Sequence, residues 1–126
     1  MELYSGAGLF SLPLSRIVGD QGALVTLEAD EAAVADAANN LGRSVCEPFV
    51  GDVDGSAVRE LNDYIGGVEA IVADPPRAGA GQEVCHAMAN TGDQCIVLVS
   101  CDPAAASRDL HDLCERGYRI ADMRAW

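Results

Sequence analysis

Short apolar runs alternate with helix-like segments from one end of the chain to the other. The runs that we predict to form strands cover residues 2–4, 23–28, 45–50, 68–73, 95–100 and 117–126. The segments that we predict to form helices cover residues 9–17, 31–41, 56–65, 78–90 and 104–115. Strands that alternate with helices form a mainly parallel sheet covered on both faces. The sequence therefore predicts a doubly wound α/β fold, with ligands bound beyond the carboxyl ends of the strands.

The length of 126 residues and the apolar share of 49% suit one domain with a modest core, over residues 1–126. The longest apolar runs fall short of the about 18 residues that a membrane-spanning helix needs. The N-terminus lacks the pattern of a signal peptide, so we expect a cytoplasmic protein without a membrane partner. The five cysteines are odd in number and have no Cys-x-x-Cys spacing, which indicates reduced thiols rather than disulfides or a metal site.

The formal net charge is −12, and all eight basic residues are arginines. Phosphate contacts need clustered cations, so this balance argues against a nucleic-acid-binding surface that is sufficient by itself. If the substrate is RNA, most of the affinity must come from elsewhere. Adaptation to high salt or a codon bias would also produce such an acidic chain.

Residues suited to ligand binding follow the predicted strands. Gly6 and Gly8 follow the first strand and permit a tight turn and close backbone approach. Glu28 ends the second strand, twenty positions after Gly8, about where a carboxylate meets ribose hydroxyls in nucleotide-binding α/β folds. Asp52 follows the third strand, and the 74–77 segment, Asp-Pro-Pro-Arg, follows the fourth. Taken alone, each feature also fits an ordinary turn or a solvated acid; together they favour a site.

Cys101 stands where the apolar run 95–99 ends, and we predict that this run is a fully buried strand. Asp102 is a good N-cap and Pro103 a good first residue for the next helix. The partial positive charge of a helix N-terminus favours a thiolate, so Cys101 is a candidate nucleophile. A buried or incidental cysteine is the alternative.

Four stretches resemble the S-adenosylmethionine-dependent RNA uracil-5-methyltransferases. They are residues 2–13 (Glu-Leu-Tyr-Ser-Gly-Ala-Gly-Leu-Phe-Ser-Leu-Pro), residues 74–79 (Asp-Pro-Pro-Arg-Ala-Gly), residues 99–110 (Val-Ser-Cys-Asp-Pro, then Ser-Arg-Asp-Leu), and Gly117-Tyr118. The glycine loop is shared with many methyltransferases, whereas the second and third stretches in this order are far more specific. The resemblance implies a class I methyltransferase fold with a Rossmann-like sheet, and a target uracil in tRNA or ribosomal RNA.

The resemblance also implies roles for single residues. Tyr4, Gly6 and Gly8 would form part of the cofactor site, with Glu28 on the ribose and Asp52 near the adenine. Asp74 would lie near the transferred methyl group and the uracil. Cys101 would be the nucleophile that adds to C6 of the uracil. Arg77 is the cation expected near the RNA, with a salt bridge as its alternative; for Arg108 we favour the salt bridge.

Members of that family carry a general-base glutamate after the Gly-Tyr strand, an RNA-binding domain and a cofactor-binding glutamine upstream, and in some cases an iron–sulfur cluster. The sequence does not contain these parts. We therefore expect a catalytic-domain fragment that binds the cofactor weakly and has little or no turnover. The truncated sheet would leave the strand that ends at residue 100 as an exposed edge, which favours self-association as a homodimer.

Two other classes of function stay open at this point. One is a different class I methyltransferase, acting on an exocyclic amine or on C5 of cytosine. The other is an inactive module that binds the cofactor or associates with itself. An NAD-dependent dehydrogenase is less favoured, because the third glycine of the dinucleotide fingerprint is missing after Gly8.

Overall fold

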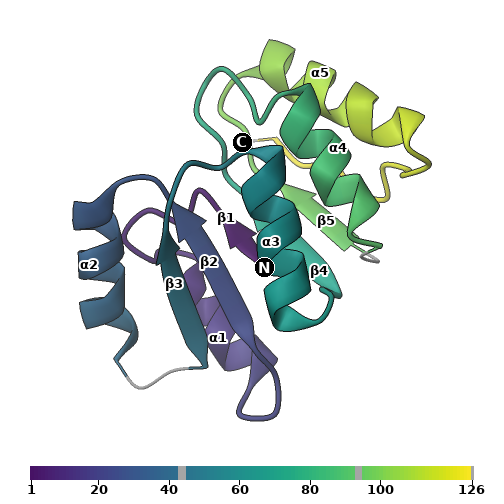
Figure 1. Cartoon of the computed structure of the whole chain (residues 1–126). Helices are drawn as coiled ribbons and strands as arrows, with labels where there is room; N and C mark the ends of the chain where they lie inside the picture. The colour runs from purple at the N-terminus through teal and green to yellow at the C-terminus, as the bar shows by residue number, and fades with distance from the viewer. Residues whose placement is uncertain (43–44, 93–94, 126) are drawn as a thin grey trace.

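The computed structural model describes residues 1–42, 45–92 and 95–125 of the chain (Figure 1). Its strands are β1 (Glu2–Leu3), β2 (Leu24–Glu28), β3 (Cys46–Val50), β4 (Ala70–Ala73) and β5 (Cys95–Leu98). They form one sheet in the order β3-β2-β1-β4-β5, and every neighbouring pair is parallel. The predicted parallel α/β sheet is confirmed.

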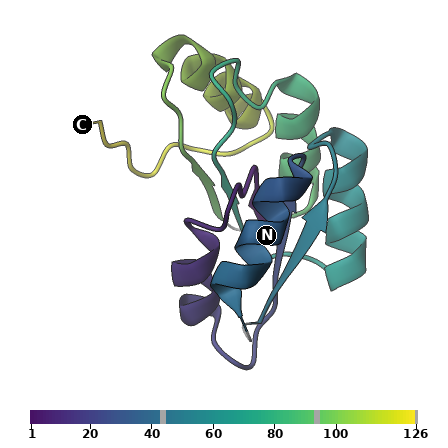
Figure 2. The same cartoon turned by 90° about the vertical axis from the view of Figure 1, so that its left-hand side faces the viewer.

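The helices are α1 (Ser11–Val18), α2 (Glu31–Leu41), α3 (Gly55–Ile65), α4 (Gln82–Asn90) and α5 (Pro103–Glu115). Contacts join α1 to α2, and others join α3 to α4 and α4 to α5. Figure 2 shows α1 and α3 on opposite sides of the sheet, so the fold is doubly wound as predicted. None of the helices in the described part of the chain is long and apolar enough to cross a membrane.

Acidic side chains start three of these helices by accepting hydrogen bonds from otherwise unpaired backbone N–H groups. Asp30 caps α2 through Ala32 and Ala33, Asp54 caps α3 through Ala57, and Asp102 caps α5 through Ala105. Each such cap contributes about 1 kcal/mol. The cap by Asp102 was predicted from the sequence and is confirmed.

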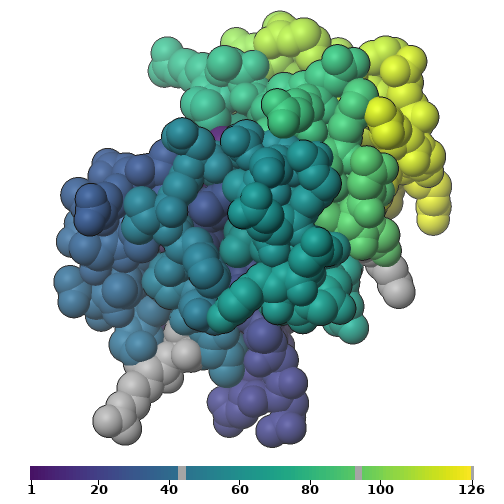
Figure 3. Space-filling view, in the orientation of Figure 1, coloured from purple at the N-terminus to yellow at the C-terminus, as the bar shows by residue number. Residues whose placement is uncertain are grey.

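The core lies between the sheet and α3, α4 and α5. Its buried residues include Leu3, Val25, Leu27, Val58, Leu61, Ile71, Val84 and Met88. The central strand β1 contributes Leu3, which is fully covered. In the space-filling view the purple residues of β1 are almost hidden behind the neighbouring elements (Figure 3).

The prediction that the run 95–99 is fully buried was wrong. β5 is the last strand of the sheet, and its residues alternate between exposed and half-buried; Val97 is 47% exposed. An apolar run without polar alternation usually indicates a strand covered on both faces, but an edge strand can carry the same composition.

Two further boundaries differ from the prediction. The helix expected from residue 78 starts at Gln82, because Gly79 and Gly81 have φ angles of 91° and 82°, which no right-handed helix contains. The strand expected over 117–126 is not found between residues 118 and 125, which pair with no strand; Trp126 lies outside the described residues. This segment runs as an irregular trace (Figure 2).

Candidate functional site

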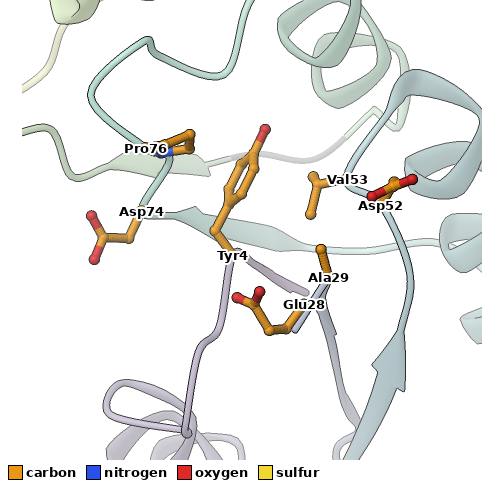
Figure 4. Close-up of a pocket in the computed structure, with 7 residues that line it drawn as sticks. All are labelled: Tyr4, Glu28, Ala29, Asp52, Val53, Asp74 and Pro76. Atoms are coloured by element: carbon orange, nitrogen blue, oxygen red, sulfur yellow. The ribbon is translucent and has the colours of Figure 1, made fainter. Parts of the chain in front are cut away.

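A cavity of about 470 Å³ opens at the carboxyl ends of the central strands. Its lining residues come from the last residue of β2 and from the segments that follow β1, β2, β3 and β4: Tyr4, Glu28, Ala29, Asp52, Val53, Asp74 and Pro76. Figure 4 shows the Tyr4 ring in the middle, with the Glu28 carboxylate below it and Asp74 and Asp52 on opposite sides. Four side chains that we predicted for a cofactor site are therefore gathered around one cavity. Ala29, Val53 and Pro76 were not predicted, although Pro76 belongs to a motif that we singled out.

The glycine loop is fixed to the cavity through Glu28. The Gly6 N–H donates to Glu28 Oε2 at 2.9 Å, and the Asp30 N–H donates to Oε1 at 2.9 Å. Both carboxylate oxygens are thus held, which orients the side chain. Gly6 and Gly8 have φ angles of 52° and 87°, a region that glycine adopts readily.

Tyr4 is the only described residue other than glycine with a positive φ, 61°. Such a conformation costs about 1–3 kcal/mol and concentrates at functional sites. The Tyr4 N–H donates to the Leu27 carbonyl at 2.9 Å, which helps to hold the strained backbone. Burial, together with the nearby Cys85 and Asp109, raises the pKa of Tyr4 to about 12. The phenol therefore stays protonated at neutral pH and can act as a hydrogen-bond donor.

Three carboxylates, Glu28, Asp52 and Asp74, line the cavity together. Asp52 and Asp74 are exposed, and no side-chain hydrogen bond is recorded for either within the described residues. Carboxylates that face solvent inside a concave site attract cationic groups. The cavity is therefore suited to a ligand that carries positive charge.

Cys101 is exposed and lies in the turn between β5 and α5. This turn is ordered by Ser100 Oγ, which donates to the Asp102 carbonyl at 3.1 Å. β5 pairs with β4, with Leu98 opposite Ala73. Cys101 and Asp74 therefore both follow the carboxyl ends of neighbouring strands, on the same side of the sheet. Cys101 does not line the cavity, and neither does Arg77, which is exposed.

Sequence reasoning missed Glu2, a carboxyl group in the central strand that is only 1% exposed. Ser11 Oγ, at the start of α1, donates to Glu2 Oε2 at 2.6 Å. Burial is the main cause that raises the pKa of Glu2. The contact ties the central strand to the helix that follows the glycine loop. The sequence signal that could have identified Glu2 is an acidic residue within a strand that is otherwise apolar.

The chain is similar in sequence to several bacterial RNA methyltransferases. An uncharacterized RNA methyltransferase of Bifidobacterium longum is 37% identical over 99% of the chain, and one of Streptomyces coelicolor is 40% identical over all of it. The 23S rRNA (uracil(1939)-C(5))-methyltransferase RlmD of Psychrobacter arcticus is 38% identical over 95% of the chain. No protein-family model matches.

A solved structure agrees with the sequence relatives. It is the tRNA (uracil-54, C5)-methyltransferase of Pyrococcus abyssi in complex with S-adenosyl-L-homocysteine, with a TM-score of 0.76 and 27% identity over 96% of this chain. The chain spans 24–29% of the length of the three sequence relatives and 28% of that structure. By sequence and by fold, the chain is therefore similar to a segment of RNA methyltransferases, and two of the four named here are uracil-C5 methyltransferases.

Proposed function

We propose that the cavity binds S-adenosylmethionine and that the protein transfers its methyl group to C5 of a uridine in tRNA or ribosomal RNA. The observation that carries this proposal is the convergence of Tyr4, Glu28, Asp52 and Asp74 on one cavity beside the glycine loop. S-adenosyl-L-homocysteine in the similar methyltransferase of known structure supports the choice of ligand.

The charges of the cavity suit this cofactor. S-adenosylmethionine carries a sulfonium and an ammonium group, so the cofactor as a whole is attracted by the negative charge of Glu28, Asp52 and Asp74 in the cavity, and Asp74 is the one assigned next to the sulfonium. We assign Glu28 to the ribose hydroxyls, because its fixed carboxylate retains free lone pairs on both oxygens. Asp52 is assigned to the adenine side and Asp74 to the methyl side. Gly6 and Gly8 let the backbone approach the cofactor closely.

Cys101 is the proposed nucleophile. Uracil C5 is a weak nucleophile, but addition of the Cys101 thiolate to C6 gives an enolate whose C5 attacks the sulfonium methyl group. The bond between the methyl carbon and the sulfur breaks, and its electron pair stays on the sulfur of the S-adenosylhomocysteine that is released. A base then removes the C5 proton, and the thiolate leaves C6, which restores the ring. The place of Cys101 beside the strand end that carries Asp74 supports this role.

Calorimetric titration with S-adenosylhomocysteine tests the cofactor site. Asp52→Ala is the sharpest variant, since no side-chain hydrogen bond is recorded for Asp52 and its loss leaves the described packing intact. We expect its affinity to fall by about 10-fold or more, the value of one hydrogen bond to a charged group. Glu28→Ala should weaken binding further, because it also releases the glycine loop. Exposed Asp63 on α3 supplies the matched control, Asp63→Ala. Unchanged binding by Asp52→Ala and Glu28→Ala would contradict the proposed site.

RNA is the proposed partner, with Arg77 as the contact on this chain, and the cytoplasm is the proposed location of the protein. We also propose that two copies associate through the β5 edge. The other edge strand, β3, carries Glu47 and Pro48, which discourage pairing, whereas β5 reads Cys-Ile-Val-Leu without a charge or proline. Pairing about a two-fold axis would bring two β5 strands together.

A further inference from the structure

Asp109 is a buried carboxylate outside the proposed cofactor cavity. It is 2% exposed and lies in α5. Its Oδ2 accepts a hydrogen bond from the Ala80 N–H at 2.7 Å, and its Oδ1 accepts one from the Gly81 N–H at 3.1 Å. A buried carboxylate is costly unless it is hydrogen-bonded, so these two contacts account for its presence in the interior.

The loop formed by residues 78–81, here the 78–81 loop, is shaped around this carboxylate. Gly79 has a φ of 91°, and a Cβ atom there would lie 2.7 Å from Asp109 Oδ2. The adjacent Arg108 reaches the same loop from outside, since its Nη2 donates to the Ala78 carbonyl at 3.3 Å. The loop thus meets α5 at three of its four residues through hydrogen bonds. Arg108 has no recorded salt bridge within the described residues, contrary to the role that we favoured for it.

Asp109 also completes the start of α4. Gly81 is the N-cap residue of α4 and supplies no side-chain cap. The first N–H groups of a helix lack partners within it and favour a negative charge nearby. The Asp109 carboxylate accepts a hydrogen bond from the N-cap N–H of Gly81 and places a negative charge near this end of α4. The buried thiol of Cys85, one turn further along α4, lies beside it as well.

The two segments that Asp109 joins carry the residues of the proposed chemistry. The 78–81 loop directly follows the 74–77 segment, which holds Asp74, Pro76 and Arg77. α5 directly follows Cys101, and Asp102 caps it. Asp109 lies seven positions after Asp102, about two helical turns into α5. A rigid helix therefore connects the cysteine turn to the carboxylate that holds the loop.

We propose that Asp109 is a positioning residue that fixes the 74–77 segment relative to Cys101, so that uridine, nucleophile and methyl group are aligned. The inference rests on the proposed function, in which these two segments face the same uridine. Alignment of reacting groups contributes strongly to rate, and a displacement of about 1 Å can cost about 100-fold. Asp109 itself touches neither cofactor nor RNA in this scheme.

Asp109→Asn tests the inference in the full-length protein. The amide keeps the size of the side chain, but its NH₂ group faces one backbone N–H donor in place of an acceptor oxygen. We expect the single-turnover rate of methyl transfer, normalised to the sites that bind S-adenosylhomocysteine, to fall by about 10-fold or more. The affinity for S-adenosylhomocysteine should change by less than about 2-fold. Asp63→Asn on α3 is the matched control and should react like the wild type.

The normalisation separates positioning from support of the fold. A residue that only stabilises the fold would lower the number of binding sites and leave the rate per site unchanged. If Asp109→Asn does not fold, Gly79→Ala displaces the same carboxylate from the loop side and should give the same loss of rate per site. A wild-type rate per site in the folded variant, or loss of cofactor binding along with the rate, would overturn the inference.

Cys101→Ser separates this inference from the proposed function. The wild-type protein should form a covalent adduct with RNA that contains 5-fluorouridine, because fluorine at C5 blocks the final proton removal. If Cys101→Ser methylates RNA at the wild-type rate, the proposed mechanism fails. If Cys101→Ser is inactive while Asp109→Asn reacts at the wild-type rate per site, only the inference about Asp109 fails.

Discussion

Glu2 places a carboxyl group in the central strand, directly behind the glycine loop. Its Oε2 accepts a hydrogen bond from Ser11, whereas its Oε1 is buried and has no hydrogen-bond partner among the described residues. Burial favours the neutral acid, which is why the pKa of Glu2 is raised. Between its ordinary pKa of 4.5 and the raised value, the folded chain holds more protons than the unfolded chain. Stability from this group is thus present at low pH and lost as the pH rises through the raised pKa.

Glu2→Gln should abolish the loss of stability that ionisation of Glu2 causes as the pH rises. The amide oxygen can still accept from Ser11, and the group cannot ionise. We expect the free energy of unfolding of Glu2→Gln to equal or exceed that of the wild type at pH 7, with the difference shrinking towards pH 4.5. Urea denaturation of both proteins between pH 4 and pH 8 measures this. A variant that is less stable than the wild type at every pH would contradict it, and Ser11→Ala would then show how much the hydrogen bond contributes.

At this scale, the sequence predicted residue types better than residue environments. The spacing of Gly6, Gly8 and Glu28 indicated that they belong together, because strand ends of a parallel sheet converge. It did not predict that Glu28 would hold the loop by a hydrogen bond to Gly6, which depends on the turn geometry. Nor did the sequence predict the positive φ of Tyr4, because a positive φ is normally expected only at glycine.

At the scale of elements, the alternation of strands and helices predicted the sheet, whereas the edges of the sheet depended on strand order. Order is set by contacts distant in sequence, so the apolar run of β5 was wrongly expected in the interior. The same run has no charged residue, which is why the proposed pairing of two copies is assigned to β5.

Val97→Lys tests that edge. Val97 is 47% exposed in the middle of β5, and a lysine on an exposed edge strand opposes pairing with another chain. We expect light scattering at high micromolar concentration to show a dimer for the wild type and a monomer for Val97→Lys. Val50→Lys places the same charge on the opposite edge strand, where Val50 is 54% exposed, and should leave the dimer intact. A monomeric wild type would rule out the proposed association.

At the scale of the whole molecule, the net charge of −12 opposes any contact with RNA, which is itself negatively charged. A strongly acidic surface repels phosphates, so the few arginines near the cavity matter more than their number suggests. The composition indicated this constraint, but it did not show where each arginine lies relative to the cavity. The structure leaves Arg77 exposed beside the cavity, whereas Arg108 is bonded to the 78–81 loop.

Arg77→Ala should therefore weaken RNA binding without affecting the cofactor. Loss of one phosphate contact lowers the slope of log affinity against log salt concentration by about 1, uniformly across RNA sequences. We expect S-adenosylhomocysteine binding to stay unchanged, because Arg77 does not line the cavity. Arg16→Ala, in the exposed last turn of α1, removes the same charge at the end of that helix remote from the glycine loop and should leave the slope unchanged. Equal effects of the two variants would mean that net charge, rather than a contact by Arg77, governs RNA binding by the full-length protein.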